Sequence, residues 1–261
     1  MTAATRITSR QHPVVRRCRE LGAGPDAGDV LLDGERLVAE ALAAGVQLTA
    51  FLTDGSRDAL AARAAAAGAD VYETSEAVLA SASPVRTSSG VVAVARWDTA
   101  PLGDVLTPAP ALAVALVDVQ DPGNVGSVIR SADALGATGV VAVGATAAPG
   151  AWKTLRGSMG SAFRLPVSRG TLAPLVEAAR SAGCRLVATV AHQGQSPDAF
   201  DWRQPVLLLV GREGAGLPPA ALAEADVSVS VAMRTGVDSL NVAVATALLL
   251  AEARRIRSLV G

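Results

Sequence analysis

Aromatic residues and cysteines are scarce in this 261-residue chain. Phe, Tyr and Trp make up 3% of it, whereas 50% of its residues are hydrophobic. We therefore expect a core of small aliphatic side chains and close packing between helices and sheets. The two cysteines, Cys18 and Cys184, lie far apart and have no cluster of His residues near them. This pattern favours neither a disulfide framework nor a zinc site, and we expect no metal.

Long apolar runs are missing as well. No stretch approaches the roughly 18 apolar residues that a membrane span needs, and the first residues lack the apolar core of a signal segment. We expect a cytoplasmic protein that does not enter a membrane. A chain of this length suffices for one large α/β domain or two modest ones.

Lysine is nearly absent, because Lys153 is the only one. Positive charge must come from arginine, whose planar guanidinium suits phosphate. The formal net charge of −1 gives no global reason to expect a polyanion as partner. Five arginines nevertheless crowd the N-terminal arm. They are Arg6, Arg10, Arg16, Arg17 and Arg19. Such an arm fits either contact with RNA or a solvated, poorly ordered terminus.

Two α/β regions flank a proline-containing stretch. Residues 101–110 show no apolar period, and we place a linker there. Residues 1–100 alternate short strand and helix patterns, which predicts a small α/β domain. Residues 111–261 alternate buried apolar runs with helical patterns, which predicts a mostly parallel sheet covered by helices on both faces. The last pattern, residues 240–259, predicts a long helix.

Three polar segments follow predicted strands of the second domain, where open parallel sheets place ligand sites. The first is DPGNVGSVIRSADALGA. It puts Asn124 in a glycine-flanked turn and Arg130 in the helix that follows, so both side chains could face one pocket. A turn asparagine and a surface arginine would explain this pattern when it is taken alone.

The second segment, VGREGAGLP, holds Glu213 among Gly211, Gly214 and Gly216. Their missing side chains leave room for a ligand to approach the backbone. The spacing differs from the GxGxxG of a dinucleotide loop, and Glu213 would repel phosphate. A neutral or cationic ligand therefore fits this segment better than a phosphate.

The third segment, MRTGVDSLNVAVATALLLAEA, runs from an irregular loop into the last helix. Asp238 or Ser239 is the expected N-cap of that helix, and Asn241 the expected residue of its first turn. Capping alone would explain these residue types.

The three segments resemble, in order and in character, the three motifs of the SpoU, or TrmH, family of RNA ribose methyltransferases in the SPOUT superfamily. LRGSMGSAFRLPV, between the first and the second, is similar to a further family stretch. The resemblance covers about residue 111 to the C-terminus. In the first domain, SRQHPVVRRCREL and LLDGERLVAEAL look like the substrate-binding domain often fused to these enzymes.

The resemblance implies transfer of a methyl group from S-adenosylmethionine to a ribose 2′-hydroxyl in structured RNA. It favours 23S ribosomal RNA as the substrate and leaves tRNA open. It also implies a deep C-terminal trefoil knot and an active homodimer. The family's catalytic positions match Arg130, Asn124, Glu213, Ser239 and Asn241. Its cofactor-binding positions match Gly211, Val231 and Leu240, with Val190, Met233, Ser239 and Asn241.

Among these residues, Arg130 is expected to handle the ribose hydroxyl, by taking its proton or by orienting it beside a phosphate. Arginine stays protonated because its pKa lies above about 12, so a base role would need help from the substrate phosphate. Methylation of a base is the nearest alternative reaction. A cysteine-dependent base methylation is remote, because neither cysteine has an activating neighbour. A non-catalytic RNA-binding factor with the same fold is the alternative from another class.

Overall fold

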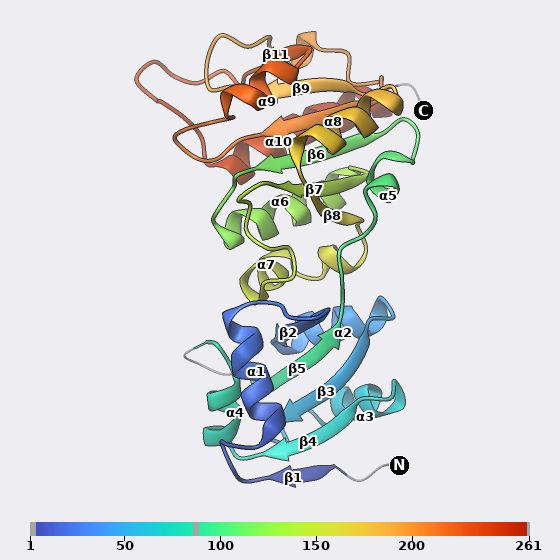
Figure 1. The fold of residues 1–261 in the computed structure, drawn as a ribbon, viewed down its shortest axis with the longest axis vertical. Helices are drawn as coiled ribbons and strands as arrows, with labels where there is room; N and C mark the ends of the chain where they lie inside the picture. Colours follow the sequence, from blue (N-terminus) through green and yellow to red (C-terminus); the bar gives the residue numbers. More distant parts are fainter. Residues whose placement is uncertain (1–3, 86–88, 260–261) are drawn as a thin grey trace. The chain divides into compact units, whose positions relative to one another are not determined.

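The computed structural model describes residues 4–85 and 89–259 and divides the chain into two compact units (Figure 1). Unit 1 consists of Met1–Asp98 and Gly150–Phe163, and unit 2 of Thr99–Pro149 and Arg164–Gly261. The predicted domains also include residues 1–3, 86–88 and 260–261, which lie outside the described residues.

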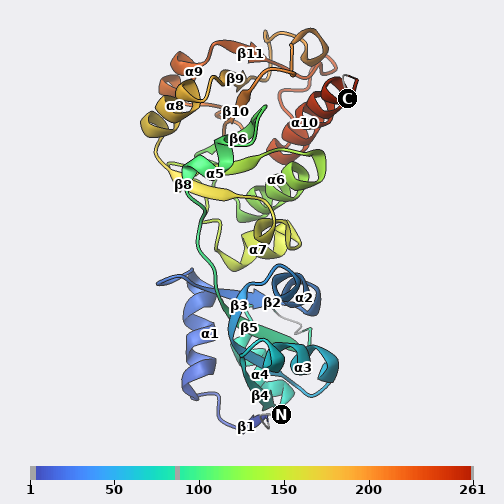
Figure 2. The ribbon, with the colours of Figure 1, turned by 90° about the vertical axis from the view of Figure 1, so that its right-hand side faces the viewer.

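Unit 1 contains a five-stranded mixed sheet. Its strands, in spatial order, are β1 (Thr5–Ile7), β4 (Asp70–Thr74), β3 (Gln47–Thr53), β5 (Val91–Arg96) and β2 (Asp29–Asp33). Strand β5 runs antiparallel to β2 and β3, whereas β1, β4 and β3 are parallel. Its helices are α1 (Pro13–Ala23), α2 (Glu35–Ala43), α3 (Asp58–Ala66) and α4 (Glu76–Ala82). Figure 2 shows α1 and the pair α2 and α3 on opposite sides of the sheet.

Helix α1 shows that the N-terminal arm is ordered. Its buried stripe consists of Val15, Cys18 and Leu21, spaced three residues apart on one face. Pro13 occupies the first turn, where its missing N–H costs nothing. The Nδ1 atom of His12 accepts a bond from the Val14 amide at 3.4 Å. The structure therefore contradicts a poorly ordered terminus. The sequence predicts strands at residues 30–32, 46–52, 70–72 and 90–95 and helices at 35–44 and 57–67, and it misses β1, α1 and α4.

Helix α7 (Trp152–Ser158) and the 3₁₀ turn η1 (Ser161–Phe163) belong to unit 1 although the chain reaches them from unit 2. Leu155 of α7 is fully buried. The guanidinium of Arg156 lies 3.6 Å from the carboxylate of Asp33, at the end of β2. Sequence patterns placed this segment in the second domain, because a helical pattern does not say which sheet the helix packs on.

Unit 2 is built on a six-stranded sheet whose neighbouring strands are all parallel, which confirms the expected mostly parallel sheet. Their spatial order is β11 (Val227–Val229), β9 (Arg185–Thr189), β10 (Val206–Val210), β6 (Leu112–Val117), β7 (Gly139–Val143) and β8 (Val167–Gly170) (Figure 1). The apolar run of residues 227–231 predicts a strand, and β11 covers only its first three residues.

Two layers of helices cover this sheet (Figure 2). One layer holds α5 (Leu102–Leu106), α8 (Leu172–Ser181) and α9 (Pro219–Glu224), and the other α6 (Pro122–Leu135) and α10 (Val242–Ser258). The 3₁₀ turn η2 (Pro197–Ala199) contacts α10. Alternate residues of a strand point to opposite faces. Accordingly, Leu207 and Leu209 of β10 share a cluster with Leu175 of α8 and Val105 of α5.

The stretch 101–110, expected as a linker, contains α5. This helix packs on β7, β8 and α8, so it is part of unit 2. Pro101 is its N-cap, and Pro108 follows its C-terminal end. Prolines at these two places delimit a helix without breaking it.

The C-terminal end of α10 is tied to the amino ends of the strands by Arg257. Its half-buried guanidinium donates to four backbone carbonyls at 2.8–2.9 Å, those of Trp202, Pro110, Ala111 and Gln204. Burial lowers the pKa of Arg257. Within residues 4–85 and 89–259, no helix has the length and apolar character needed to cross a membrane.

Candidate active site

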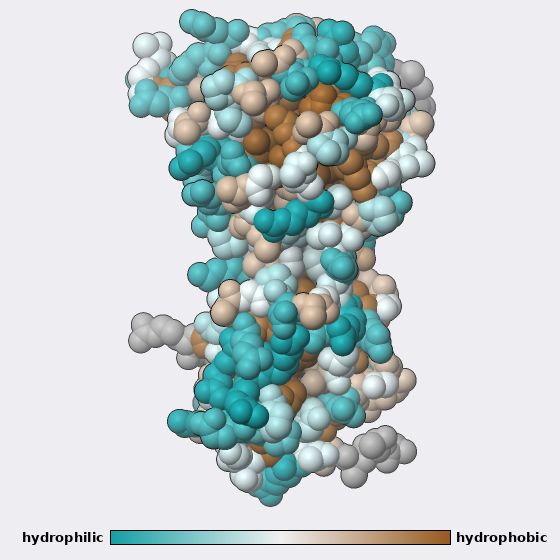
Figure 3. Space-filling model, viewed as in Figure 1, coloured by the Kyte–Doolittle hydropathy of each residue, from teal (hydrophilic) through white to brown (hydrophobic). Residues whose placement is uncertain are grey.

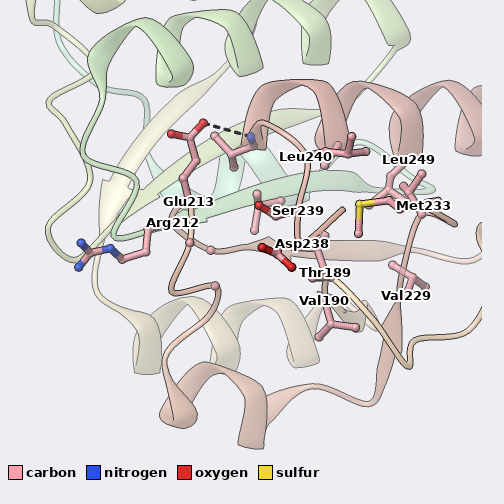
Figure 4. A pocket seen from close by; sticks show the side chains of 18 residues that line it. Thr189, Val190, Arg212, Glu213, Val229, Met233, Asp238, Ser239, Leu240 and Leu249 are labelled. Carbon is pink, nitrogen blue, oxygen red and sulfur yellow. Dashed lines mark hydrogen bonds between the residues drawn. The ribbon is translucent and has the colours of Figure 1, made fainter. Parts of the chain in front are cut away.

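A pocket of about 450 Å³ opens at the carboxyl ends of β9, β10 and β11. Thr189, Val210 and Val229, the last residues of these strands, line its inner wall. The loop after β10 and residues 231–240 close its sides (Figure 4). Because the three strands are parallel, their carboxyl ends meet at one edge, which is where such sheets bind ligands.

Three side chains from distant segments meet beside this pocket. The Nδ2 atom of Asn241 donates to Glu213 Oε1 at 2.6 Å and to Asn124 Oδ1 at 3.1 Å. Asn124 Nδ2 donates to the same Glu213 oxygen at 3.0 Å. The backbone amide of Val242 approaches that oxygen at 3.4 Å, the bond drawn in Figure 4. The carboxylate of Glu213 thus joins all three motif segments.

The glycines of the loop after β10 have different roles. A Cβ atom on Gly211 would collide with the backbone of Gly216 and Leu217. The absent side chain at this position therefore lets the loop fold back on itself, where an Arg212–Gly216 bridge closes it. Gly214 and Gly216 have φ angles of 75° and 69°, which few other residues adopt. The missing side chain of Gly211 therefore makes room for the loop itself, while its backbone still lines the pocket.

The N-cap of α10 is Asn241, so the expected cap at Asp238 or Ser239 is wrong. The Asn241 Oδ1 atom accepts bonds from the amides of Ala243 at 2.9 Å and Val244 at 3.3 Å. One amide side chain therefore caps the helix with its oxygen and binds Glu213 with its nitrogen. Asp238 and Ser239 instead belong to the loop that lines the pocket.

Most of the predicted cofactor residues line this pocket. They are Gly211, Val190, Val231, Met233, Ser239 and Leu240. Glu213, predicted as a catalytic residue, lines the pocket as well. Asn124 and Asn241 are not among the lining residues and join the site through Glu213. Asn124 lies inside α6, as its third residue, and not in a turn before it.

Arg130 lies apart from the pocket lining. It is exposed on α6, about one and a half turns beyond Asn124. In the described part of the chain its guanidinium has no hydrogen-bond or ion-pair partner. The structure therefore does not bring Arg130 into the same pocket as Ser239 and Leu240, and it leaves the guanidinium open to a ligand.

Sequence reasoning missed several pocket residues, among them Thr189, Asp238 and Leu249. In Figure 4 the Asp238 carboxylate lies beside Ser239 on the pocket side, whereas Arg212 points away. The apolar run of residues 186–190 predicts a strand, and the place of Thr189 near its carboxyl end could have identified this residue. Asp238 was considered only as a helix cap, and nothing in the sequence shows Leu249 turning toward the loop.

The pocket suits a small organic cation. Its volume falls in the range of roughly 300–1,000 Å³ that is common for cofactor sites. Val190, Met233, Leu240 and Leu249 offer apolar surface for an aromatic base, and the Asp238 carboxylate offers charge for a cation. No group of three or more His, Cys, Asp or Glu residues arranged to hold a metal occurs within the described ranges.

A cysteine nucleophile has no support in either unit. Both cysteines are buried and free. Burial raises the pKa of Cys18 to about 12 and also raises that of Cys184. Neither thiol lines the pocket, and a thiolate is the form that attacks.

The family follows from comparison with known proteins. A model described as the SpoU rRNA Methylase family matches residues 111–251, more than half of the chain. A second, described as the MRM3-like substrate binding domain, matches residues 25–93. The chain belongs to the SpoU rRNA methylase family, and the resemblance seen in its motifs is confirmed.

Individual relatives agree in sequence and in fold. The chain is 34% identical to the 23S rRNA (guanosine(2553)-2′-O)-methyltransferase RlmP of Bacillus subtilis, over 84% of this chain and 86% of that protein. The AdoMet-bound rRNA methyltransferase from Sinorhizobium meliloti is 33% identical and superposes with a TM-score of 0.87, covering 97% of this chain and 98% of that one. The SpoU methyltransferase AviRb from Streptomyces viridochromogenes, in complex with AdoMet, gives 32% identity, 96% and 100% coverage, and a TM-score of 0.82.

Proposed function

We propose that this chain transfers a methyl group from S-adenosylmethionine to a ribose 2′-hydroxyl of 23S ribosomal RNA. The supporting observation is the convergence of Asn124, Glu213 and Asn241, from three separate motif segments, beside a pocket of cofactor size. The name of the Bacillus subtilis relative specifies this reaction on 23S rRNA. Transfer RNA is the alternative substrate.

The pocket residues divide between holding the cofactor's base and its charged part. We assign the backbone of Gly211, Val231 and Leu240 to the adenine, and the side chains of Val190 and Met233 to the apolar wall beside it. Ser239 fixes the loop on the cofactor side. The bound cofactor supplies an electrophilic methyl group carried on a sulfonium. An acidic lining at Asp238 favours such a cation over a phosphate-bearing ligand.

Glu213 acts as a brace rather than as a base in this scheme. Its Oε1 atom already accepts from Asn124, Asn241 and the Val242 amide. These bonds hold the loop after β10 against the first turn of α10. Methyl transfer needs the attacking oxygen, the methyl carbon and the sulfur nearly in line, and such alignment can supply about 7–11 kcal/mol of the barrier reduction.

Arg130 is the residue that we assign to the substrate. Its exposed guanidinium has no carboxylate partner in residues 4–85 and 89–259, so it is available to an RNA phosphate and the adjoining hydroxyl. As a cation the guanidinium orients the hydroxyl, whose proton passes to the neighbouring substrate phosphate. A non-catalytic RNA-binding factor would not need an exposed Arg130 together with a pocket of cofactor size.

We further propose that the chain works as a cytoplasmic homodimer with a trefoil knot. Val244 and Leu248, one turn apart on α10, are 49% and 47% exposed, which is unusual for large apolar side chains on a helix. A second copy of the chain would cover them. In a dimer, Arg130 of one subunit can serve the pocket of the other. The knot would thread residues 233–258 through the loop that carries Glu213.

Mapping of 2′-O-methyl marks tests the proposal in cells. Ribosomal and transfer RNA are compared from cells with and without the gene, and from cells complemented with Arg130→Ala. We expect one ribosomal mark to disappear with the gene and to stay absent with the variant. A lost mark in tRNA would replace the substrate, and a lost base methylation would overturn the proposed reaction.

A further inference from the structure

Helix α1 and the residues before it carry an arginine face with no acidic partners. Arg10, Arg16 and Arg19 are exposed, and none of them forms an ion pair within the described residues. Arg6 is not part of this face, because its neighbour Ile7 packs against α1 and alternate strand residues point to opposite sides. Other arginines of unit 1 are paired, such as Arg57, which lies 2.7 Å from Glu35.

The fold holds this arginine face in a fixed direction. Val15, Cys18 and Leu21 anchor α1 to the sheet, so Arg16 and Arg19 point outward from neighbouring positions on one helix face. The guanidinium of Arg19 donates to the Arg10 carbonyl at 3.0 Å, which fixes the loop before the helix. Figure 3 shows a continuous hydrophilic surface over α1.

Arg17, on the same helix, provides the contrast. It donates to Asp26 at 2.6 Å and to Asp29 at 2.8 Å, and these bonds raise its pKa. It also lies 3.8 Å from Glu20. The Arg17 guanidinium therefore links α1 to the start of β2. Within the described residues Arg16 makes no such bond, and Arg19 bonds a backbone carbonyl but no carboxylate.

This face lies outside both regions that match family models, because the substrate-binding match begins at residue 25. Any contribution to substrate binding is therefore additional to what that match describes. The residue type indicates the partner. Arginine forks bind phosphate oxygens in pairs, and phosphates dominate the affinity of proteins for nucleic acids.

We propose that the arginine face, Arg10, Arg16 and Arg19, docks the phosphate backbone of the substrate RNA. It adds affinity and orientation without reading bases, since phosphate contacts position a nucleic acid and carry no sequence information. The inference rests on the proposed function in one respect, which is that the substrate is RNA.

The test compares two double variants that remove the same charge. Arg16→Ala/Arg19→Ala removes two members of the face. Arg63→Ala/Arg169→Ala is the control, since both residues are exposed and form no ion pair within the part of the chain that the structure describes. An unmodified 23S ribosomal RNA transcript is the probe, and its affinity is measured by fluorescence anisotropy at several KCl concentrations. Circular dichroism verifies folding, and calorimetry measures S-adenosylmethionine binding.

We expect the first variant to bind the transcript at least about tenfold more weakly at 0.1 M salt, with a salt slope smaller by about 1.4–1.8. Its affinity for S-adenosylmethionine stays unchanged, and the control behaves like the wild type. If both double variants lose affinity for the transcript equally, or if neither loses any, the proposed role of the arginine face is wrong. Wild-type binding that depends on Arg16 and Arg19 but yields no ribose methylation would support the face and refute the proposed function. Ribose methylation that the Arg16→Ala/Arg19→Ala change leaves unaffected would support the proposed function and refute the role of the arginine face.

Discussion

The two sheets of this chain present their polar groups in opposite ways. In unit 2, parallel strands end at one edge, and the loops that follow enclose a pocket braced by Asn124, Glu213 and Asn241. In unit 1, β5 runs against both of its neighbours, so it ends at the edge opposite the other four strands. Unpaired arginines lie instead on the outside of α1. We therefore assign the chemistry to unit 2 and propose electrostatic recognition for unit 1.

The largest expected effect tests whether the chemistry of unit 2 reaches Arg130. Arg130→Ala should lower kcat at least about a hundredfold, the scale seen when a charge-stabilising donor is removed from a reacting centre. S-adenosylmethionine affinity should change little, because Arg130 does not line the pocket. Single-turnover transfer and calorimetry measure the two quantities. Turnover close to wild type would remove Arg130 from the mechanism.

The next effect separates the stability of unit 2 from its chemistry. Arg257→Ala removes the guanidinium from four carbonyls, of which that of Ala111 keeps its bond from the Val206 amide, and we expect the free energy of unfolding to fall by about 3 kcal/mol. Arg254 is a matched control on the same helix, since it makes one 3.2 Å bond to Ala134. Urea denaturation measures both. If the Arg257 and Arg254 variants lose the same free energy of unfolding, the bonds to the four carbonyls do not stabilise the fold more than a single bond does.

Asn241→Ala tests whether one residue serves both the helix and the pocket. Loss of the cap should cost about 1–2 kcal/mol of unfolding free energy, and loss of the Glu213 bond should weaken S-adenosylmethionine binding. Asn124→Ala is the comparison, because it breaks a bond to Glu213 and leaves the Asn241 cap of α10 in place. Thermal unfolding and calorimetry are the measurements. If Asn124→Ala destabilises the fold as much as Asn241→Ala, the cap has no separate role.

The smallest effect concerns unit 1 and its pH dependence. Burial of Asp33, which is 4% exposed, raises its pKa above the ordinary 3.8, although Ser83 and Arg156 oppose the shift. The folded state therefore holds the proton more tightly than the unfolded state, and stability from this group falls as pH rises from 3.8 through the folded pKa. The unfolding free energy of wild type minus that of Asp33→Asn should decrease over this interval. A difference that grows with pH would reverse the assigned cause.

The sequence predicted which residues form the site more accurately than it predicted their local conformation. Buried runs such as residues 206–210 identified the parallel strands, and the motif segments identified Asn124, Glu213 and Asn241 as neighbours. The cap of α10 was wrong because Ser, Asp and Asn have similar capping propensity. The tertiary bond from Asn241 to Glu213 makes the choice among them, and no local pattern records that bond.

The division of the chain was harder to predict for a related reason. Residues 150–163 carry the pattern of a helix within the second domain, yet Leu155 and Arg156 pack with unit 1. Periodicity shows which face of a helix is buried, but not which sheet receives it. The buried Asp33 that meets Arg156 lies over a hundred residues earlier in the chain. Long-range pairing of this kind is visible only in the folded structure.

The most direct test of the central claim is the chemical identity of the product. Purified protein is incubated with labelled S-adenosylmethionine and a 23S ribosomal RNA transcript, and the RNA is digested to nucleosides for mass spectrometry. We predict a labelled 2′-O-methylnucleoside with the wild type and almost none with Arg130→Ala. Label on a base, or wild-type protein that binds the cofactor and labels no RNA, would contradict the account.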